Sequence, residues 1–326
     1  MIYPKFIKEK DTIGICAPSS GVGHKLPDFL KSNRVLRKYG YRIKETASVR
    51  VNNVRSASAK KRAAELDQLV TDKKIDYILC AAGGDFMLEM MPYVDFEHIK
   101  ENPKWIAGMS DPTNILFTVT TMLDIATLYG RNGAGFCEKP ERSEKTFLDY
   151  MKGDIHSQKS YKKYISFLDL INDEEAYQDV KWICKNSKEE LEGRLIGGCI
   201  ESIEKLIGSR FDYTNDFIER YKDDGIIWYF DLFDMSAYNF YLTLLQFKNA
   251  GWFRYCKGVL VGRPAFPKVE DKKLDYVKAA DKALGKIPHI MEMDIGHTFP
   301  NFTMINGAMC KVKYENGKGE ISFKLK

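Results

Sequence analysis

Short apolar runs that end in small residues alternate with amphipathic segments over the first 130 residues of the chain. Residues 11–18 and 76–82 are two such runs, and each is followed by serines or glycines. Residues 26–39 and 58–72 carry apolar side chains at helical spacing. Strands that alternate with helices favour a parallel sheet with right-handed crossovers. The pattern therefore predicts an N-terminal parallel α/β domain of the flavodoxin or Rossmann-like type. Further elements are expected at residues 41–45, at 105–108 and in the long apolar stretch 115–128.

A change of composition separates this region from the rest of the chain. Residues 138–190 are polar with weak periodicity, as in a linker or covering segment. The second half is richer in strand patterns, and it ends in a hairpin signal at Asn316-Gly317. We therefore predict an α/β domain at residues 1–140, a linker or covering segment at 141–190 and a strand-rich α+β domain at 191–326. The elements expected in the last domain are strands at 226–230, 258–262, 289–295, 310–314 and 320–324 and a helix at 238–249.

Composition excludes several classes of protein. The 326 residues are 44% hydrophobic, which excludes a disordered chain and favours more than one hydrophobic core. The formal charge of +5 is spread without a basic stripe, so no nucleic-acid partner is expected. The seven cysteines form no C-x-x-C pair, and no window approaches the ~20 apolar residues of a membrane span. We therefore expect a cytoplasmic protein with reduced thiols and no membrane partner.

Glycines follow two of the predicted strands. Gly21 and Gly23 resemble the start of a dinucleotide fingerprint, but Leu26 stands where the third glycine belongs. No cofactor is therefore expected. Gly83 and Gly84 end the run at 76–82, where two glycines can point backbone N–H groups into a cavity, as an oxyanion requires. A simple tight turn is the alternative.

Ser110 follows the predicted strand at 105–108 and precedes an apolar segment. A serine on a sharp strand-to-helix turn can present its hydroxyl at the top of a sheet as a nucleophile. The surrounding sequence is not G-x-S-x-G, and a helix cap is the alternative.

A nucleophilic serine needs a base, and the chain has five histidines from which to choose. His297 follows the predicted strand 289–295 directly, where a side chain can reach a ligand. Asp231 ends the strand 226–230 and is placed to orient an imidazole. A structural histidine and an ordinary N-cap or exposed acid beside Asp234 are the alternatives.

Taken together, a series of stretches carries a more specific signal. They are residues 11–19, 61–64, 83–85, 89–95, 108–111, 129–132, 193–198, 226–231, 258–262 and 296–298. In this order they resemble the motifs of the LD-carboxypeptidase family of serine peptidases, and most closely the branch typified by the microcin C self-immunity protein. The resemblance implies a homodimer of two-domain subunits, with the site where the two domains meet.

The resemblance also implies roles for individual residues. Ser110 is the expected nucleophile, His297 its general base and Asp231 the acid that orients it. The expected oxyanion donors are the backbone N–H groups of Gly84, Asp85 and Asp111. The expected substrate contacts are Gly83, Arg131 and Arg194, of which the two arginines are candidates to bind a free carboxylate. No metal is implied, and the sequence has no metal-ligand spacing such as H-E-x-x-H.

This chain departs from the family pattern at two places. The family usually has Glu where Asp231 stands, and the shorter side chain retracts the carboxylate by roughly 1.5 Å, so Asp234 is a possible substitute. Phe86-Met87-Leu88 follows Gly-Gly-Asp where the immunity branch tends to be more polar.

The expected reaction is amide hydrolysis through an acyl-enzyme, on a peptidyl- or aminoacyl-nucleotide or alternatively on murein tetrapeptide. A catalytically impaired binding protein on the same fold is the alternative of another class.

Overall fold

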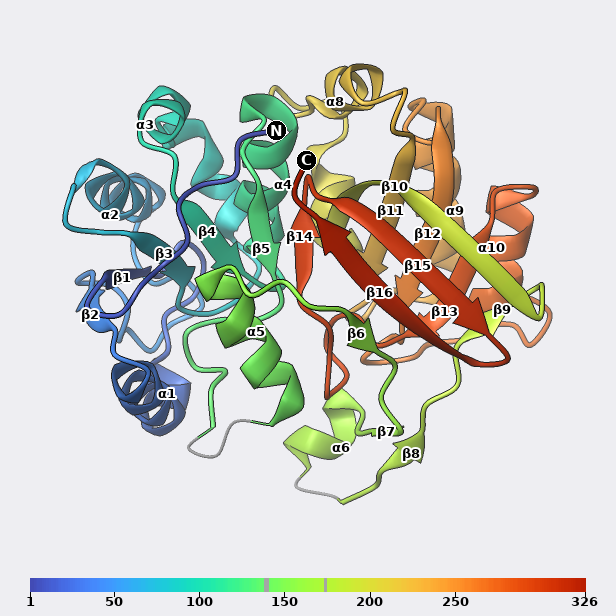
Figure 1. The fold of residues 1–326 in the computed structure, drawn as a ribbon, viewed down its shortest axis with the longest axis horizontal. Coiled ribbons are helices and arrows are strands. Elements are labelled where there is room, and N and C mark those ends of the chain that lie inside the picture. The colour runs from blue at the N-terminus through green and yellow to red at the C-terminus, as the bar shows by residue number, and fades with distance from the viewer. Residues whose placement is uncertain (138–140, 173–174) are drawn as a thin grey trace. The chain divides into compact units, whose positions relative to one another are not determined.

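The structure, a computed structural model, describes residues 1–137, 141–172 and 175–326 (Figure 1). These residues divide into two compact units. Unit 1 comprises Met1–Ile155 and Thr303–Gly307, and unit 2 comprises His156–Phe302 and Ala308–Lys326. The predicted boundary at residue 140 lies outside the described residues. The predicted linker 141–190 is not a separate segment, because its described residues are divided between the two units.

Unit 1 is built from alternating strands and helices. Its strands are β1 (Thr12–Cys16), β2 (Arg42–Glu45), β3 (Tyr77–Cys80), β4 (Trp105–Gly108), β5 (Thr127–Tyr129) and β14 (Met304–Asn306). Its α-helices are α1 (Leu26–Lys38), α2 (Ala59–Thr71), α3 (Phe96–Glu101), α4 (Thr113–Leu123) and α5 (Arg142–Lys152), and 3-10 turns cover Gly23–Lys25, Met87–Glu89 and Met91–Tyr93.

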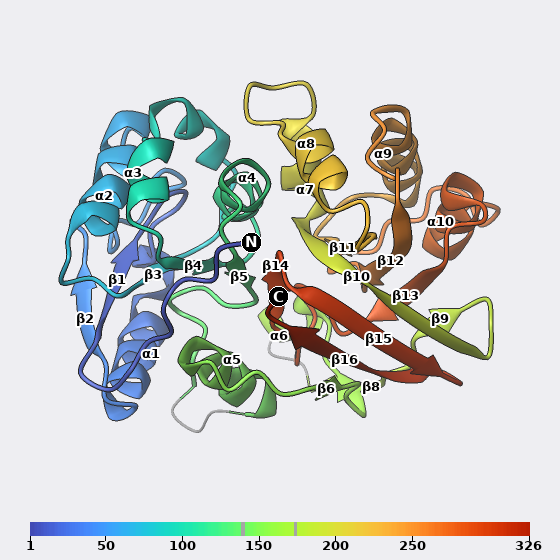
Figure 2. The ribbon, with the colours of Figure 1, turned by 45° about the horizontal axis from the view of Figure 1, so that its top comes forward.

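The sheet of unit 1 has the strand order β14-β5-β4-β3-β1-β2. Its neighbours pair in parallel except β14, which runs antiparallel to β5. Helices α1 and α5 cover one face, and α2, α3 and α4 cover the other (Figure 2). The order 2-1-3-4-5 is that of flavodoxin-like domains, which bind ligands beyond the carboxyl ends of the strands. The predicted parallel α/β fold is thus confirmed.

The apolar stretch 115–128 supplies both a helix and a strand. Residues 113–121 of α4 are all buried, although five of them are Thr or Asn. The chain then turns at Asp124, which adopts a left-handed conformation with φ of 60°, and enters β5. The sequence pattern alone did not separate the two elements.

Unit 2 contains more strands than unit 1, as predicted. Its strands are β6 (Gln158–Lys159), β7 (Lys163–Tyr164), β8 (Gln178–Asp179), β9 (Ile183–Cys184), β10 (Lys188–Cys199), β11 (Ile226–Asp231), β12 (Cys256–Gly262), β13 (His289–Met293), β15 (Met309–Glu315) and β16 (Lys318–Lys324). Its helices are α6 (Phe167–Ile171), α7 (Ile200–Ile203), α8 (Thr214–Arg220), α9 (Ala237–Asn249) and α10 (Tyr276–Leu284), with a 3-10 turn at Glu204–Leu206.

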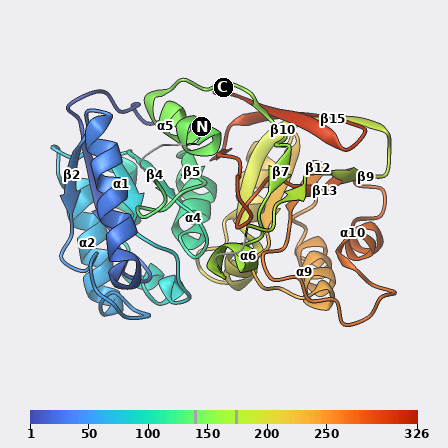
Figure 3. The ribbon, with the colours of Figure 1, turned by 90° about the horizontal axis from the view of Figure 1, so that it is seen from below.

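The main sheet of unit 2 has the order β6-β16-β15-β10-β11-β12-β13-β9. Strands β10 to β13 are parallel, so their carboxyl ends share one edge. The long hairpin β15–β16 extends the sheet, and α9 packs beside α10 (Figure 3). Asn316 and Gly317 both have positive φ, as the predicted two-residue hairpin turn requires.

Helix α5 and strand β14 are among the elements of the structure that have no counterpart in the sequence prediction, as are α3, α8 and α10. Helix α5, inside the predicted linker, buries Phe147, Leu148 and Met151 and begins with a capping box. Strand β14, inside the predicted C-terminal domain, pairs with β5 of unit 1. Both depend on contacts that local patterning does not reveal. Among the described residues, no helix combines the length and apolar character needed to cross a membrane.

Candidate active site

Ser110 lies on a sharp turn between β4 and α4. It adopts a left-handed conformation with φ of 72°, which is uncommon for residues other than glycine. Its N–H donates to the Tyr129 hydroxyl at 3.1 Å, and its carbonyl accepts the N–H of Thr113 at 2.8 Å, at the first residue of α4. The hydrogen bonds on both sides hold the turn in this strained form. Its half-buried side chain lies at the carboxyl edge of the sheet, as predicted.

The glycine turn after β3 lies against this serine. A Cβ atom on Gly83 would come within 3.0 Å of Ser110 Cβ and 3.2 Å of its Oγ. Gly84 has φ of 143°, and a Cβ there would overlap the hydroxyls of Ser19 and Ser20. In the described part of the chain, no acceptor faces the N–H groups of Gly84 and Asp85. These two N–H groups directly follow Gly83 in the chain and are candidate donors to an oxyanion formed beside Ser110.

Asp111, the residue after Ser110, forms hydrogen bonds through its side chain. The Asp111 carboxylate is buried, and its Oδ2 accepts the Ser19 hydroxyl and the N–H of Met87, the latter at 2.8 Å. Its Oδ1 accepts Asn114 Nδ2 at 2.9 Å. Asp111 thus ties the loops after β1 and β3 to the serine turn. The sequence predicted only its backbone N–H as functional.

Arg62 of α2 anchors the same two loops. Its side chain is fully buried, and Nη1 donates to the carbonyls of Pro18 and Phe86 at 2.8 and 2.9 Å. Nη2 donates to Glu89 at 3.1 Å. Burial lowers the pKa of Arg62, and the Glu89 charge opposes that effect. The motif at 61–64 was the sequence signal for this residue, although it did not indicate a role.

In unit 2, His297 and Asp231 form a buried pair. Asp231 is the last residue of β11 and is fully buried. Its Oδ2 lies 2.8 Å from His297 Nδ1, and its Oδ1 accepts the backbone N–H of His297 at 3.2 Å. Asp231 therefore reaches the imidazole despite being shorter than Glu. The two contacts with Asp231 fix the orientation of the imidazole ring.

Gly296 makes this close approach possible. It has φ of 90°, and a Cβ atom there would overlap the Asp231 carboxylate and lie 2.8 Å from its Cβ. Residues 296–298 form one of the family-like motifs, but the motif does not reveal this reason for the glycine. The absence of a side chain at 296 allows a short acid to contact His297.

We expect Gly296→Ala to lower the free energy of unfolding by about 2–4 kcal/mol, because it adds both a disfavoured φ and an overlap. Gly285→Ala is the matched control, since Gly285 has φ of 64° and nothing within 4 Å of the added Cβ. Urea unfolding measures both variants. Equal losses in the two variants would contradict the proposed overlap with Asp231.

Aromatic rings surround the imidazole. The ring centroids of Phe233 and Phe167 lie 4.7 and 5.9 Å from that of His297. Phe266 contacts both phenylalanines, at 5.2 and 5.5 Å. Phe167 belongs to α6, inside the predicted linker, so sequence reasoning did not place it near His297. The rings limit the access of water to the His297–Asp231 pair.

The loop after β11 is held by a different carboxylate. Glu201 Oε1 accepts the backbone N–H groups of Phe233, Asp234 and Met235 at 2.8–3.0 Å. The Asp234 side chain is exposed and pairs with Lys268 at 3.6 Å, so Asp234 does not replace Asp231 beside His297. A pocket of about 520 Å³ adjoins this loop, lined in part by Glu201, Asp234 and Met235.

The neighbouring Cys199 is the strand partner of Asp231. Burial raises the pKa of its thiol well above the usual range, and the nearby carboxylates of Glu201 and Asp231 add to the shift. Cys199 therefore stays protonated and is not a candidate nucleophile.

The two arginines expected to bind substrate have structural partners. Arg131 is buried and donates to the Gly135 carbonyl at 3.1 Å and to the Ser143 hydroxyl at 2.6 Å. Arg194 pairs with Asp224 and stacks on Tyr221 at 4.2 Å.

Arg194 also lies in the middle of β10, five residues before the carboxyl end of the strand. It pairs with Ile226 at the start of β11, whereas Cys199 pairs with Asp231 at the end. The five intervening steps span roughly 16 Å. The structure therefore does not bring Arg194 to the His297 edge of unit 2.

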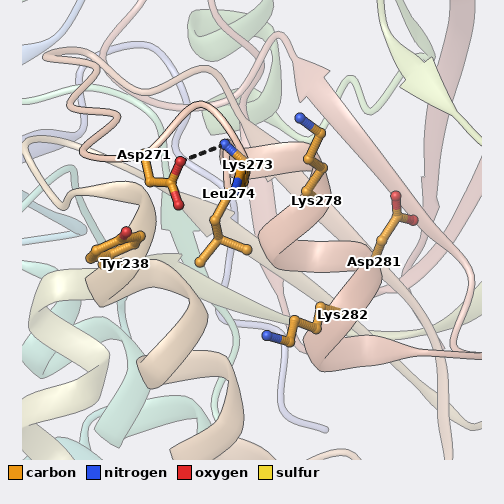
Figure 4. A pocket seen from close by; sticks show the side chains of 7 residues that line it. All are labelled: Tyr238, Asp271, Lys273, Leu274, Lys278, Asp281 and Lys282. Carbon is orange, nitrogen blue, oxygen red and sulfur yellow. Dashed lines mark hydrogen bonds between the residues drawn. The ribbon is translucent and has the colours of Figure 1, made fainter.

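Another pocket of unit 2, of about 700 Å³, contains none of the predicted site residues (Figure 4). Its lining comes from α9, α10 and the segment before α10, and Asp271 there accepts the N–H of Lys273 at 2.8 Å. Its wall combines lysines and aspartates without a buried polar group.

Nowhere in the described residues do three His, Cys, Asp or Glu side chains gather where they could hold a metal ion.

Comparisons with known proteins match both halves of the chain to one family. Residues 13–130 match the LD-carboxypeptidase N-terminal domain, and residues 192–312 match the LD-carboxypeptidase C-terminal domain. The chain belongs to the LD-carboxypeptidase family. The resemblance inferred from its motifs is thus confirmed.

Relatives of this LD-carboxypeptidase family member include a putative carboxypeptidase and a self-immunity protein. It is 26% identical to the putative carboxypeptidase YocD of Bacillus subtilis, with 98% of each chain covered. It is 24% identical to the microcin C7 self-immunity protein MccF of Escherichia coli, covering 94% of this chain and 91% of MccF. A solved structure of wild-type MccF matches with a TM-score of 0.84 and 20% identity, covering 100% and 99% of the two chains. The muramoyltetrapeptide carboxypeptidase of Oxalobacter formigenes matches with a TM-score of 0.76 and 18% identity, covering 96% and 98%.

Proposed function

We propose that the protein is a serine carboxypeptidase or amidase in which Ser110, His297 and Asp231 act as nucleophile, general base and orienting acid. The observation that carries the proposal is the Ser110 turn, where a strained serine lies against Gly83, next to the N–H groups of Gly84 and Asp85. A nucleophile beside preorganised oxyanion donors is the arrangement that acyl transfer needs. The buried His297–Asp231 pair supplies the matching base.

In this mechanism Ser110 Oγ attacks the amide carbonyl carbon while its proton passes to His297 Nε2. The carbonyl oxygen takes the negative charge and accepts hydrogen bonds from Gly84 and Asp85. His297 then protonates the leaving nitrogen as the C–N bond breaks, which leaves an acyl ester on Ser110. Water, deprotonated by His297, hydrolyses the ester and restores the serine. Asp231 keeps Nδ1 protonated throughout.

We further propose a peptidyl- or aminoacyl-nucleotide as substrate. MccF, which matches over nearly its whole length, has been solved with aspartyl sulfamoyl adenosine and with adenosine monophosphate. A murein tetrapeptide is the second candidate, because Phe86 and Met87 follow Gly-Gly-Asp where the immunity branch tends to be more polar. The Bacillus subtilis protein described as a probable murein peptide carboxypeptidase is a relative that supports it.

Incubation with an aspartyl-adenylate amide and with a murein tetrapeptide, followed by mass spectrometry of the products, tests the substrate. We expect hydrolysis of an amide bond in one of them. A fluorophosphonate probe tests the chemistry separately, and we expect one adduct on Ser110 that His297→Ala prevents. Absence of both hydrolysis and labelling, with a known serine peptidase labelled in parallel, would favour a binding protein over an enzyme.

A further inference from the structure

Arg55 lies beside the oxyanion loop of unit 1 in a fixed orientation. Its guanidinium stacks on the Phe86 ring at 3.6 Å from the centroid, and Phe86 directly follows Gly84-Asp85. Nε and Nη2 bind both oxygens of Glu89, at 2.9 and 2.6 Å. The side chain is still 42% exposed. Because stacking and the bidentate ion pair hold the group, little conformational entropy remains to be lost when it binds a ligand.

The segment around Arg55 packs directly on the loop that faces the serine. Ser56 donates its N–H to the Ser19 carbonyl at 3.0 Å, and Ser20 Oγ donates to the Val54 carbonyl at 2.9 Å. The Ser19 and Ser20 hydroxyls in turn lie against the α-carbon of Gly84. Arg55 is therefore separated from the Ser110 turn by one layer of loop.

Arg55 and Arg62 share one carboxylate, Glu89, while the charge of Asp111 also acts on Arg62. The nearby Asp111 carboxylate is buried and already accepts the hydrogen bonds described above. Arg62 is buried and bonded to backbone carbonyls, so it cannot reach a ligand. Among the described residues, no acceptor faces the Nη1 nitrogen of Arg55.

We propose that Arg55, held on Phe86, binds the anionic group of the substrate. The proposal rests on the proposed function and assigns the role that sequence analysis gave to Arg131 and Arg194. A carboxylate or a phosphate can accept from the exposed Nη1 edge of a guanidinium. The proposal also gives Phe86, a residue at which this chain departs from the family pattern, the role of holding the Arg55 guanidinium. Arg55 is thus a specificity-determining residue, not a group that takes part in bond cleavage.

The test compares charged and neutral forms of one ligand. For the carboxylate, kcat/KM is measured on a tetrapeptide ending in D-alanine, as the free acid and as the carboxamide. For the phosphate, Kd is measured calorimetrically for adenosine monophosphate and for adenosine. We expect wild-type protein to favour the charged form of at least one pair by about 10- to 100-fold, and Arg55→Gln to bring that ratio close to one.

Two further variants make the result specific. Arg50→Gln is the matched control, because Arg50 is 53% exposed and also binds a carboxylate with two nitrogens, that of Glu45 at 2.7 and 3.0 Å. Arg50→Gln should leave the preference for the charged form unchanged. Arg55→Lys should keep only part of that preference, because an ammonium group cannot bind an anion through two parallel N–H groups and stacks less well on an aromatic ring.

The outcomes separate the two proposals. A wild-type protein without preference for either charged form, or an Arg55→Gln variant that keeps the preference, contradicts the role of Arg55. Absence of any amide hydrolysis by the wild type contradicts the proposed function, while the calorimetric comparison still decides the role of Arg55.

Discussion

Ser110→Ala is expected to lower kcat/KM for the confirmed substrate by about 10⁴- to 10⁶-fold, as in serine peptidases that lose the nucleophile. The hydroxyl is the group that forms the acyl-enzyme, and the neighbouring N–H groups cannot replace it. Single-turnover assays with mass spectrometry measure both the loss of hydrolysis and the loss of the fluorophosphonate adduct. Full activity in this variant would exclude Ser110 as the nucleophile.

The backbone of Ser110 gives this prediction a second, independent readout. Because φ of 72° suits glycine better than serine, Ser110→Gly should be inactive yet as stable as the wild type, or more stable by up to about 1 kcal/mol. Ser236→Gly is the control: Ser236 caps α9 with an ordinary φ of −72°, and its loss should cost roughly 0.5 kcal/mol. A clear loss of stability in Ser110→Gly would contradict a strained functional turn.

Much of the fold could be predicted because local chemistry specifies it. Helix α1 ends just before Gly40, whose φ of 90° suits only a residue without a side chain, and the predicted end at residue 39 is therefore close. The Asn316-Gly317 pair likewise predicted the position of the β15–β16 hairpin, because both residues adopt the positive φ that a two-residue turn requires. Strand β14 could not be found in this way, because Met304–Asn306 is only three residues long and is stabilised by pairing with β5, far earlier in the chain.

The site was predicted less completely than the fold. Strand ends and family motifs indicated Ser110, His297 and Asp231, since each of them follows or ends a strand. They could not indicate that Asp111 binds Ser19, 92 residues earlier. Nor could composition show that Arg131 and Arg194 are engaged in structural contacts while Arg55 remains exposed. Such roles depend on which loops meet at one edge of a sheet.

Asp231→Asn is expected to lower kcat by about 10⁴-fold, because an amide in place of the carboxylate favours the wrong tautomer of the paired histidine. Asp234→Asn is the matched control, since Asp234 is exposed and three residues away, and it should stay within twofold of the wild type. Steady-state kinetics on the confirmed substrate measure both. Equal losses of kcat in the two variants would contradict the role of Asp231 and favour Asp234 as the orienting acid.

Asp231→Glu is the sharper test, because glutamate is the residue that the family usually has at this position. In this chain the carboxylate already lies 2.8 Å from His297 Nδ1, and it fills the space left by the missing side chain of Gly296. An added methylene must push the fully buried carboxylate into the imidazole or the backbone. We therefore expect a loss of kcat of about 10- to 100-fold, between the wild type and Asp231→Asn. Unchanged or higher activity would mean that the loop carrying His297 adjusts to the longer acid, and that Gly296 does not determine the length of the acid.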